Sequence, residues 1–274
     1  MTTADPWALP PLPLALTLPL WRLPLQGPDA LRVLHGQTTQ ALLDLSPGQR
    51  RLTCCVTATA RLRALATVEA TSDGALLDVE AGDAAAVRQA LDRVLFPADR
   101  VTLGALEPLE RVVDLLPADD PAATVAFWGL PARCHHRRPD GTAAAPDPLL
   151  WAWLRCRQGI PAAPAELNDD HNPFELGLDE RVSLSKGCYL GQETLAKLQS
   201  RDGVRQRLRR WWCPPGGPVP EAGHELTGPE GRRLGRVTTV VPWAGGAVGL
   251  AMVRREALDQ PELGGLLLSS PSSH

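Results

Sequence analysis

The sequence predicts an α+β fold, in which helices pack on a sheet and a separate β-domain ends the chain. Three observations support this class. Strand-like and helical runs follow one another over residues 29–106, which suits a small layered domain with helices against a mixed sheet. A further helical run closes at Gly159, Ile160 and Pro161. After Lys197 the pattern changes to glycine, proline and short β-like runs, and the length of 274 residues indicates more than one domain.

The first predicted element is a helix over residues 29–43, with Asp29 as its cap behind Pro28. Three strands follow, and Ser72-Asp73-Gly74 forms the turn between the second and the third. An alanine-rich helix covers residues 83–95. The predicted strands of this part lie at residues 51–56, 62–70, 75–80 and 101–106.

Two more strands are predicted next, followed by a loop rich in proline and small residues that runs to Pro148. A helix then covers residues 149–158. The strands of this part and of the β-domain lie at residues 110–116, 124–128, 208–212, 233–241 and 247–253. Prolines interrupt the leucine-rich residues 7–25, so we expect an extended segment over an apolar surface and no membrane span.

Composition argues against several classes of protein. The formal net charge of −3 shows no basic excess of the kind that nucleic-acid-binding proteins carry. The 6 cysteines form no Cys-x-x-Cys pair, and a disulfide between Cys54 and Cys55 would be strained. We therefore expect reduced thiols and a cytoplasmic location. The histidines are scattered, and we predict no metal site.

One run of eight residues carries the strongest chemical signal. It consists of Lys186, Gly187, Cys188, Tyr189, Leu190, Gly191, Gln192 and Glu193. The unpaired N–H groups at the start of the following helix and the ammonium of Lys186 both favour the thiolate of Cys188. Glu193 precedes Lys197 by four residues, the order that suits an exposed ion pair. The alternative is a helix entry in which the glycines allow close packing and Cys188 is merely small.

The same run resembles the K-G-C-Y-x-G-Q-E signature of the YgfZ family, which is related to the glycine-cleavage T-protein, an aminomethyltransferase, and to a mitochondrial iron–sulfur assembly factor. Four other segments resemble family segments in the same order, from roughly residue 24 to residue 255. They are residues 31–39 (LRVLHGQTT), 155–161 (RCRQGIP), 172–178 (NPFELGL) and 234–239 (LGRVTT). The eight-residue string is highly specific, whereas each of the other four is weak by itself.

The resemblance implies a GcvT-like three-domain ring, with ferredoxin-like α+β domains, a C-terminal β-barrel and a central hole that binds folate. It implies a discontinuous folate-binding region over residues 1–203, with about 50–108 as an inserted α+β subdomain, and a barrel over 204–274. Tetrahydrofolate or a derivative is the implied cofactor.

Two residues are the implied folate contacts. Glu175 holds the acid position of N-P-x-E, and a carboxylate can accept two pterin N–H groups at once. The alternative for Glu175 is a helix-start carboxylate beside Asn172. Arg236, or Lys186, supplies a cation for the anionic folate tail, although a solvated strand residue is the simpler account of Arg236.

Two departures from the family pattern bear on catalysis. Arg157 stands where the family has an acid, and residues 54–61 (CCVTATAR) replace the usual D-P-x-G-R. No Asp or Glu occurs between Asp44 and Glu69. Because aminomethyl transfer needs a carboxylate near the reacting folate carbon, we expect no working aminomethyltransferase.

The predicted function is therefore a folate-binding factor that supports the assembly or repair of iron–sulfur enzymes and, indirectly, tRNA modification. Cys188 would be the working thiol, in redox chemistry or in transient contact with an iron–sulfur cluster or a persulfide. The expected partners are iron–sulfur enzymes or assembly proteins, and no membrane.

Two alternatives remain open. The first is a folate-dependent one-carbon transferase or demethylase. The second is direct RNA binding, because arginines beside aromatic rings can stack on bases. The stretch concerned contains Arg201, Arg205, Arg207, Arg209, Arg210, Trp211 and Trp212. A solvated strand face explains that stretch more simply, so we expect no direct RNA binding.

Overall fold

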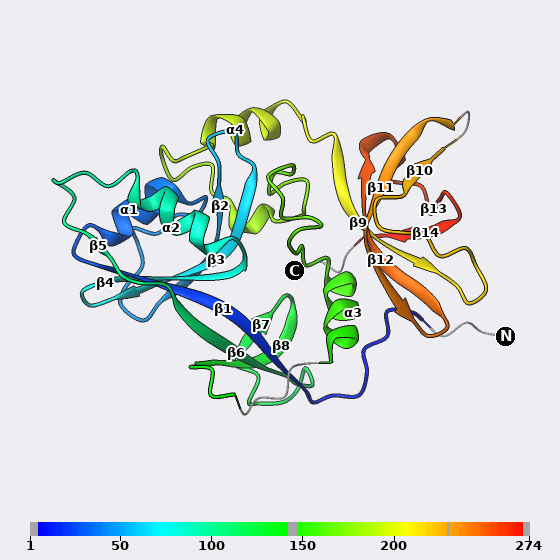
Figure 1. The fold of residues 1–274 in the computed structure, drawn as a ribbon, viewed down its shortest axis with the longest axis horizontal. Helices are drawn as coiled ribbons and strands as arrows, with labels where there is room; N and C mark the ends of the chain where they lie inside the picture. The colour runs from blue at the N-terminus through cyan, green and yellow to red at the C-terminus, as the bar shows by residue number, and fades with distance from the viewer. Residues whose placement is uncertain (1–4, 142–146, 229–230, 271–274) are drawn as a thin grey trace. The chain divides into compact units, whose positions relative to one another are not determined.

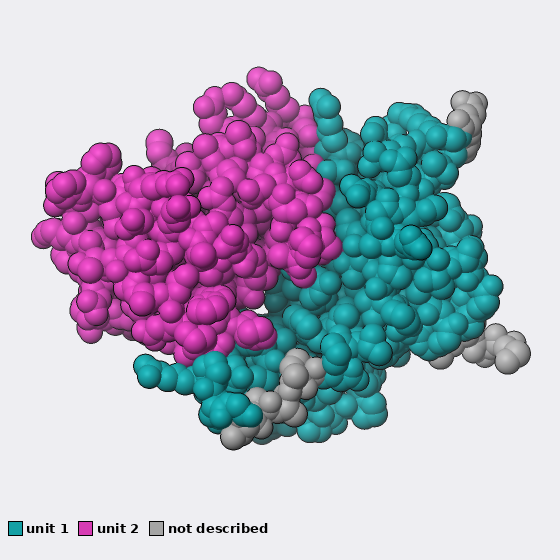
Figure 2. All heavy atoms as spheres, viewed as in Figure 1, with its two compact units in different colours: residues 1–18, 110–161, 205–274 teal, residues 19–109, 162–204 magenta. Residues whose placement is uncertain are grey.

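The structure is a computed structural model that describes residues 5–141, 147–228 and 231–270. The chain divides into two compact units (Figure 2): unit 1 contains residues 1–18, 110–161 and 205–274, and unit 2 contains residues 19–109 and 162–204. Sheets and a few helices make up the chain, so the predicted α+β class is confirmed. These units are groups of residues in mutual contact. The expected domains 1–203 and 204–274 were inferred from the family resemblance, and they stay a prediction.

Unit 2 is built on an antiparallel sheet with the strand order β2-β3-β4-β1 (Figure 1). The strands are β1 (Leu14–Gln26), β2 (Arg50–Val56), β3 (Leu62–Thr71), β4 (Gly74–Gly82) and β5 (Thr102–Leu103), which pairs with β1. The predicted mixed sheet is wrong for this unit. Short turns join β2 to β3 and β3 to β4, and a short turn can only connect antiparallel neighbours.

Helices α1 and α2 place their apolar sides on this sheet, where Leu34 and Val87 join a core that includes Leu23 and Leu77. The helical segments of unit 2 are α1 (Ala30–Gln37), α2 (Ala84–Asp92), the 3-10 turn η1 (Asp179–Arg181) and α4 (Gln192–Ser200). Helix α2 begins as predicted, since the Asp83 carboxylate accepts a hydrogen bond from the Ala86 N–H at 2.9 Å.

Helix α1 ends at Gln37 rather than at the predicted Leu43. Thr38 leaves the helix in an extended conformation and forms a β-bridge with Cys55, so tertiary pairing replaces the next helical turn. Asp29 occupies the cap position, but its side chain makes no cap hydrogen bond. Its carboxylate instead lies 3.1 Å from the Arg100 guanidinium.

In unit 1, β7 and β8 form a hairpin, and the strand β8 replaces part of the predicted loop before Pro148. The elements here are β6 (Glu107–Leu115), which begins in unit 2, β7 (Val125–Phe127), β8 (Leu130–Arg137) and α3 (Pro148–Gln158). Trp128 and Gly129 have φ angles of 48° and 77°, the positive values of a two-residue hairpin turn. The loop prediction was wrong because backbone pairing with β6 and β7 outweighs the weak strand propensity of residues 130–137.

The C-terminal part of unit 1 is a six-stranded, barrel-like antiparallel sheet with the order β10-β11-β12-β9-β14-β13. Its elements are β9 (Gln206–Cys213), β10 (Glu225–Thr227), β11 (Arg233–Trp243), β12 (Gly246–Arg254), the 3-10 turn η3 (Arg255–Ala257), β13 (Glu262–Leu263) and β14 (Leu266–Ser269). The three strands predicted for this region are confirmed. Trp211 and Val237 are fully buried in its core.

The first part of the predicted covering segment packs on unit 1, where Trp7 is buried. From Leu14 the segment is instead strand β1, because backbone pairing with β4 takes it into the sheet. The Pro6 carbonyl accepts a hydrogen bond from Trp153 Nε1 at 3.0 Å, and the Trp7 carbonyl accepts one from Arg157 Nε at 2.7 Å. Arg157, which stands at the position where the resembled family has an acidic residue, thus holds the N-terminal segment by a hydrogen bond. None of the helices in the described ranges is both long and apolar enough to cross a membrane.

Candidate functional site

Lys186 binds the C-terminal end of α1 within unit 2. Its ammonium donates hydrogen bonds to the carbonyls of Thr38 at 2.7 Å and Gln40 at 2.9 Å, and also to that of His35. Carbonyls at a helix C-terminus have no helical partner and carry partial negative charge, so a cation suits this position. Burial nevertheless lowers the pKa of Lys186 from 10.5 to about 7.

Two further contacts hold the same segment against α1. His35 Nε2 lies 3.0 Å from the Lys186 carbonyl, and His35 Nδ1 accepts a hydrogen bond from the Leu42 N–H at 3.1 Å. With Nδ1 as the acceptor, Nε2 is the ring nitrogen that donates to the Lys186 carbonyl. The Leu190 N–H donates to the Gly36 carbonyl at 3.0 Å. The motif is therefore anchored on both sides of Cys188.

Cys188 is exposed between these anchors and carries a free thiol. It precedes the first residue of α4, Gln192, by four positions. The charge of Lys186 is shared with three backbone carbonyls, so it does not act on the thiol alone. Greater reactivity of Cys188 than of the other cysteines stays a prediction.

The remaining motif residues pack and connect the segment. Tyr189 is buried with Ala60, Phe174 and Leu195, and its ring centroid lies 4.4 Å from the Lys186 ammonium. Gly191 is the N-cap of α4 with φ 79°. The rest of the motif forms two contacts: Gln192 Nε2 with the Leu184 carbonyl at 3.5 Å, and the predicted Glu193–Lys197 ion pair at 2.5 Å.

Glu175 is buried and forms a reciprocal pair with Asn172. Its Oε2 accepts a hydrogen bond from the Asn172 N–H at 3.0 Å, and Asn172 Oδ1 accepts one from the Glu175 N–H at 3.1 Å. This is the geometry of a capping box. It is the contact expected if Glu175 is a helix-start carboxylate beside Asn172. His171 Nδ1 lies 3.9 Å from the same carboxylate, and burial lowers the pKa of His171 although Glu175 opposes this. Pterin recognition by Glu175 stays a prediction.

The turn after β2, residues 57–61, contains no acidic residue and lies beside the Glu175 carboxylate. The Thr57 N–H donates to the Arg61 carbonyl at 2.9 Å, which closes the turn. The Arg61 guanidinium lies 3.9 Å from Glu175 Oε2 and donates to the Asp170 carbonyl at 2.5 Å. A carboxylate from another segment thus approaches the turn that has none of its own.

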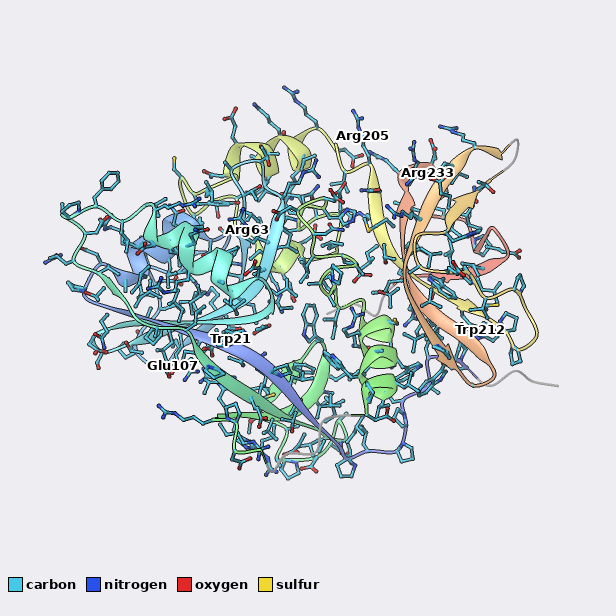
Figure 3. The ribbon with its side chains drawn as sticks, viewed as in Figure 1. Trp21, Arg63, Glu107, Arg205, Trp212 and Arg233 are labelled. Carbon is cyan, nitrogen blue, oxygen red and sulfur yellow. The ribbon has the colours of Figure 1, made fainter. Side chains whose placement is uncertain are left out.

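Unit 2 also contains an open groove of about 720 Å³. Trp21 of β1, 45% exposed, and Arg63 of β3 line it (both labelled in Figure 3), together with Asp83 and Asp169. Small residues create its volume: Gly82, Ala84, Ala85, Ala86 and Ala163. Asp169 has a positive φ of 61° and a carboxylate 4.0 Å from the Arg63 guanidinium. The start of α2 faces the groove as well, so it offers an aromatic ring, a cation, carboxylates and backbone N–H groups.

Sequence reasoning missed this groove. Trp21 belongs to the proline-interrupted segment that was expected only to cover apolar surface, and Asp169 belongs to a polar run typical of a turn. The lining comes from five separate stretches of the chain, so no local pattern could have indicated it. Neither of the predicted folate contacts is among the lining residues.

A smaller cavity lies between the motif segments of unit 2. Arg63 lines both spaces, and Gln37, Thr38 and Leu190 line the smaller one, whose volume is about 20 Å³. Residues 31–39 and 186–193 therefore meet at the smaller cavity. The other predicted folate contact, Arg236, is an exposed residue of β11 and belongs to unit 1.

Several side chains of the arginine- and tryptophan-rich stretch are engaged within unit 1. Trp211 is fully buried and donates from Nε1 to the Leu250 carbonyl at 3.1 Å. Arg209 donates to the carbonyls of Leu258 and Ser269, and the Arg210 guanidinium lies 4.8 Å from the Trp7 ring. Within the described ranges, no three His, Cys, Asp or Glu side chains are grouped so that they could hold a metal ion.

Comparison with known proteins identifies several relatives, although no family model matches the chain. The chain is 28% identical over 287 residues to a chloroplastic protein of Arabidopsis thaliana described as a candidate transferase, which covers 86% of this chain and 64% of that protein. It is 30% identical over 118 residues to the tRNA-modifying protein YgfZ of Serratia proteamaculans, which covers 41% of this chain and 36% of the relative. The chain thus spans less than two thirds of the length of these relatives.

Among solved structures, the glycine cleavage system aminomethyltransferase T of Bartonella henselae matches with a TM-score of 0.74 and 17% sequence identity. The match covers 94% of this chain and 85% of the aminomethyltransferase. At this identity the likeness concerns the fold alone.

Proposed function

Because the chain is a YgfZ-like protein with the fold of the glycine-cleavage aminomethyltransferases, we propose that it binds a reduced folate and supports the assembly or repair of iron–sulfur enzymes. Changes in tRNA modification would follow indirectly, through enzymes that depend on such clusters. The groove of about 720 Å³ in unit 2 is the observation that carries this proposal.

The lining of the groove fits the chemistry of folate. Its volume lies in the usual range for small-molecule sites. The exposed ring of Trp21 offers a face for the flat pterin, and a carboxylate such as Asp169 can accept two pterin N–H groups. Arg63 supplies a guanidinium for a carboxylate of the folate tail. Glu175, which belongs to the same unit, is proposed as a further contact, whereas for Arg236 of unit 1 a folate contact stays a prediction.

Cys188 is the proposed working group toward iron–sulfur enzymes. Its exposure and the anchors at Lys186 and Leu190 present a thiol at a defined place on the surface. The thiol would contact a cluster, a persulfide or an oxidant transiently, with iron–sulfur enzymes or assembly proteins as partners. We propose a cytoplasmic location, although the plant relative is chloroplastic.

Calorimetric titration with tetrahydrofolate and its one-carbon derivatives tests the folate site. Trp21→Ala and Asp169→Asn should each weaken binding, the latter by roughly tenfold or more if the carboxylate that accepts two pterin N–H groups is lost. Glu175→Gln tests the further contact, which lies outside the lining of the groove. Glu175→Gln keeps an oxygen for the Asn172 N–H, so the turn should stay folded. Phe96→Ala is the matched control for Trp21, since Phe96 is 73% exposed in unit 2 outside the groove. The absence of heat or thermal shift with every folate at millimolar concentration would refute the proposal.

Replacement of the thiol tests the cellular role separately. Cys188→Ser keeps the size of the side chain and should leave folding and folate affinity unchanged, while iron–sulfur enzyme activities fall in cells that lack the natural protein. Full activity with Cys188→Ser would remove the thiol from the proposal and leave the folate site standing.

A folate-dependent transferase is the second candidate. The plant relative is described as a candidate transferase, and Glu175 approaches the acid-free turn through Arg61. The missing acid in residues 54–61 still argues against aminomethyl transfer. The test is conversion of an aminomethyl donor and tetrahydrofolate by the purified chain. Steady turnover that Glu175→Gln abolishes would establish this second function, and we expect none.

A further inference from the structure

Seven exposed arginines gather at one end of the C-terminal sheet of unit 1. The antiparallel register brings together the start of β9, the end of β12 and the start of β11: Arg207 pairs with Val253, and Val253 with Gly235. Figure 3 shows Arg205 and Arg233 at this end and Trp212 at the other. We call this set the strand-end arginines: Arg205, Arg207, Arg232, Arg233, Arg236, Arg254 and Arg255.

Only part of this charge is neutralised by nearby acids. Glu225 lies 2.9 Å from Arg233, and Glu256 lies 2.7 Å from Arg232. The side chains of Arg205, Arg236 and Arg254 make no hydrogen bond or ion pair within the described part of the chain. Because the whole chain has a formal charge of −3, positive charge is concentrated at this end of the sheet.

The arrangement suits an extended anion better than a single small one. Neighbouring strands are about 4.8 Å apart, so arginines on three strands form a row instead of converging on one point. All seven residues are arginine, whose forked guanidinium binds phosphate oxygens in a bidentate manner. Trp211 is buried, so it adds no stacking surface for bases.

We propose that the strand-end arginines bind the phosphodiester backbone of a nucleic acid, without reading its base sequence. The contacts are ionic and lie on strand ends. This mode differs from the stacking on Trp211 and Trp212 that the sequence suggested as an alternative. It does not depend on folate binding, because Trp21 and Arg63 of the groove belong to unit 2.

Fluorescence anisotropy with labelled 20-nucleotide RNA and DNA of mixed sequence, at several salt concentrations, tests the proposal on the full chain. We expect binding that is insensitive to base sequence and weakens with salt. The double variant Arg205→Gln, Arg254→Gln should bind at least about fivefold more weakly, with a log–log salt slope shallower by about 1.4, or 0.7 for each lost contact on a single strand. Circular dichroism verifies that the variant is folded.

The matched control is Arg93→Gln, Arg138→Gln, which removes the same charge at two exposed arginines whose side chains also make no hydrogen bond or ion pair in the described ranges. This control should bind RNA as the natural chain does. Binding of both RNA and DNA supports recognition of phosphate, and binding of RNA alone supports the proposal with an added contact to the 2′-hydroxyl. The proposal is overturned if neither nucleic acid binds at low salt, if the control loses as much affinity, or if only a poly-glutamate peptide binds.

Discussion

Replacement of Lys186 by methionine should destabilise unit 2 and loosen the segment that carries Cys188. The substitution keeps an unbranched chain of similar length but removes all three hydrogen bonds to the carbonyls of His35, Thr38 and Gln40. Hydrogen bonds that involve a charged group contribute about 1.5–3 kcal/mol each. Desolvation of the ammonium offsets part of this, as the lowered pKa of Lys186 indicates. We therefore expect a net cost of about 2–4 kcal/mol rather than the full sum.

Urea unfolding measures the total cost, and hydrogen exchange of residues 34–42 and 186–192 locates it. The control is Lys197→Met, the same substitution at a lysine that is 57% exposed and paired with Glu193. An exposed helical pair of this kind contributes about 0.3–0.5 kcal/mol. If Lys186→Met costs no more than Lys197→Met, and exchange in the two segments is unchanged, the anchoring role of Lys186 is wrong.

The pH dependence of the same variant tests the lowered pKa. In the folded chain Lys186 loses its proton near pH 7, whereas in the unfolded chain it keeps the proton up to about pH 10.5. Between these values the unfolded state binds more protons, so the unfolding free energy of the natural chain should rise with pH. The rise relative to Lys186→Met should stay below about 1.4 kcal/mol per pH unit, since the side chain is only partly buried. If the difference in unfolding free energy between the natural chain and Lys186→Met does not change from pH 6 to 9, the hydrogen bonds to the three carbonyls keep Lys186 protonated over this range.

Two further predictions concern the motif and its neighbours. Cys188 should be alkylated near neutral pH much faster than Cys54 and Cys55, because burial raises the pKa of both of those thiols to about 12; peptide mass spectrometry gives each rate, and comparable rates in the folded chain would contradict this. Gly191→Ala should destabilise unit 2 by about 1–3 kcal/mol more than Gly187→Ala. Both glycines have positive φ, but a Cβ at Gly191 would lie 2.9 Å from the Thr57 carbonyl oxygen, whereas a Cβ at Gly187 would have no atom within 4 Å. Equal losses of unfolding free energy in urea would exclude this steric cause.

The sequence by itself determined the features that depend on residues close together in the chain. Alternating apolar residues located β2, β3, β4 and the main strands of the C-terminal sheet. Gly159 ended α3 because its φ of 68° is costly for other residues. The Glu193–Lys197 pair is a contact within one helical turn, so its spacing alone predicted it.

Tertiary structure decided the features that depend on segments far apart in the chain. Residues 130–137 became a strand because β6 and β7 supply its backbone partners, and α1 stopped at Gln37 because Thr38 pairs with Cys55. Lys186 was expected to act on Cys188 two residues away, but its ammonium bonds to carbonyls about 150 positions earlier. The groove likewise forms where five distant stretches leave space between small side chains. A hydrogen-bond partner or a cavity is a property of spatial neighbours, and only the folded chain brings those neighbours together.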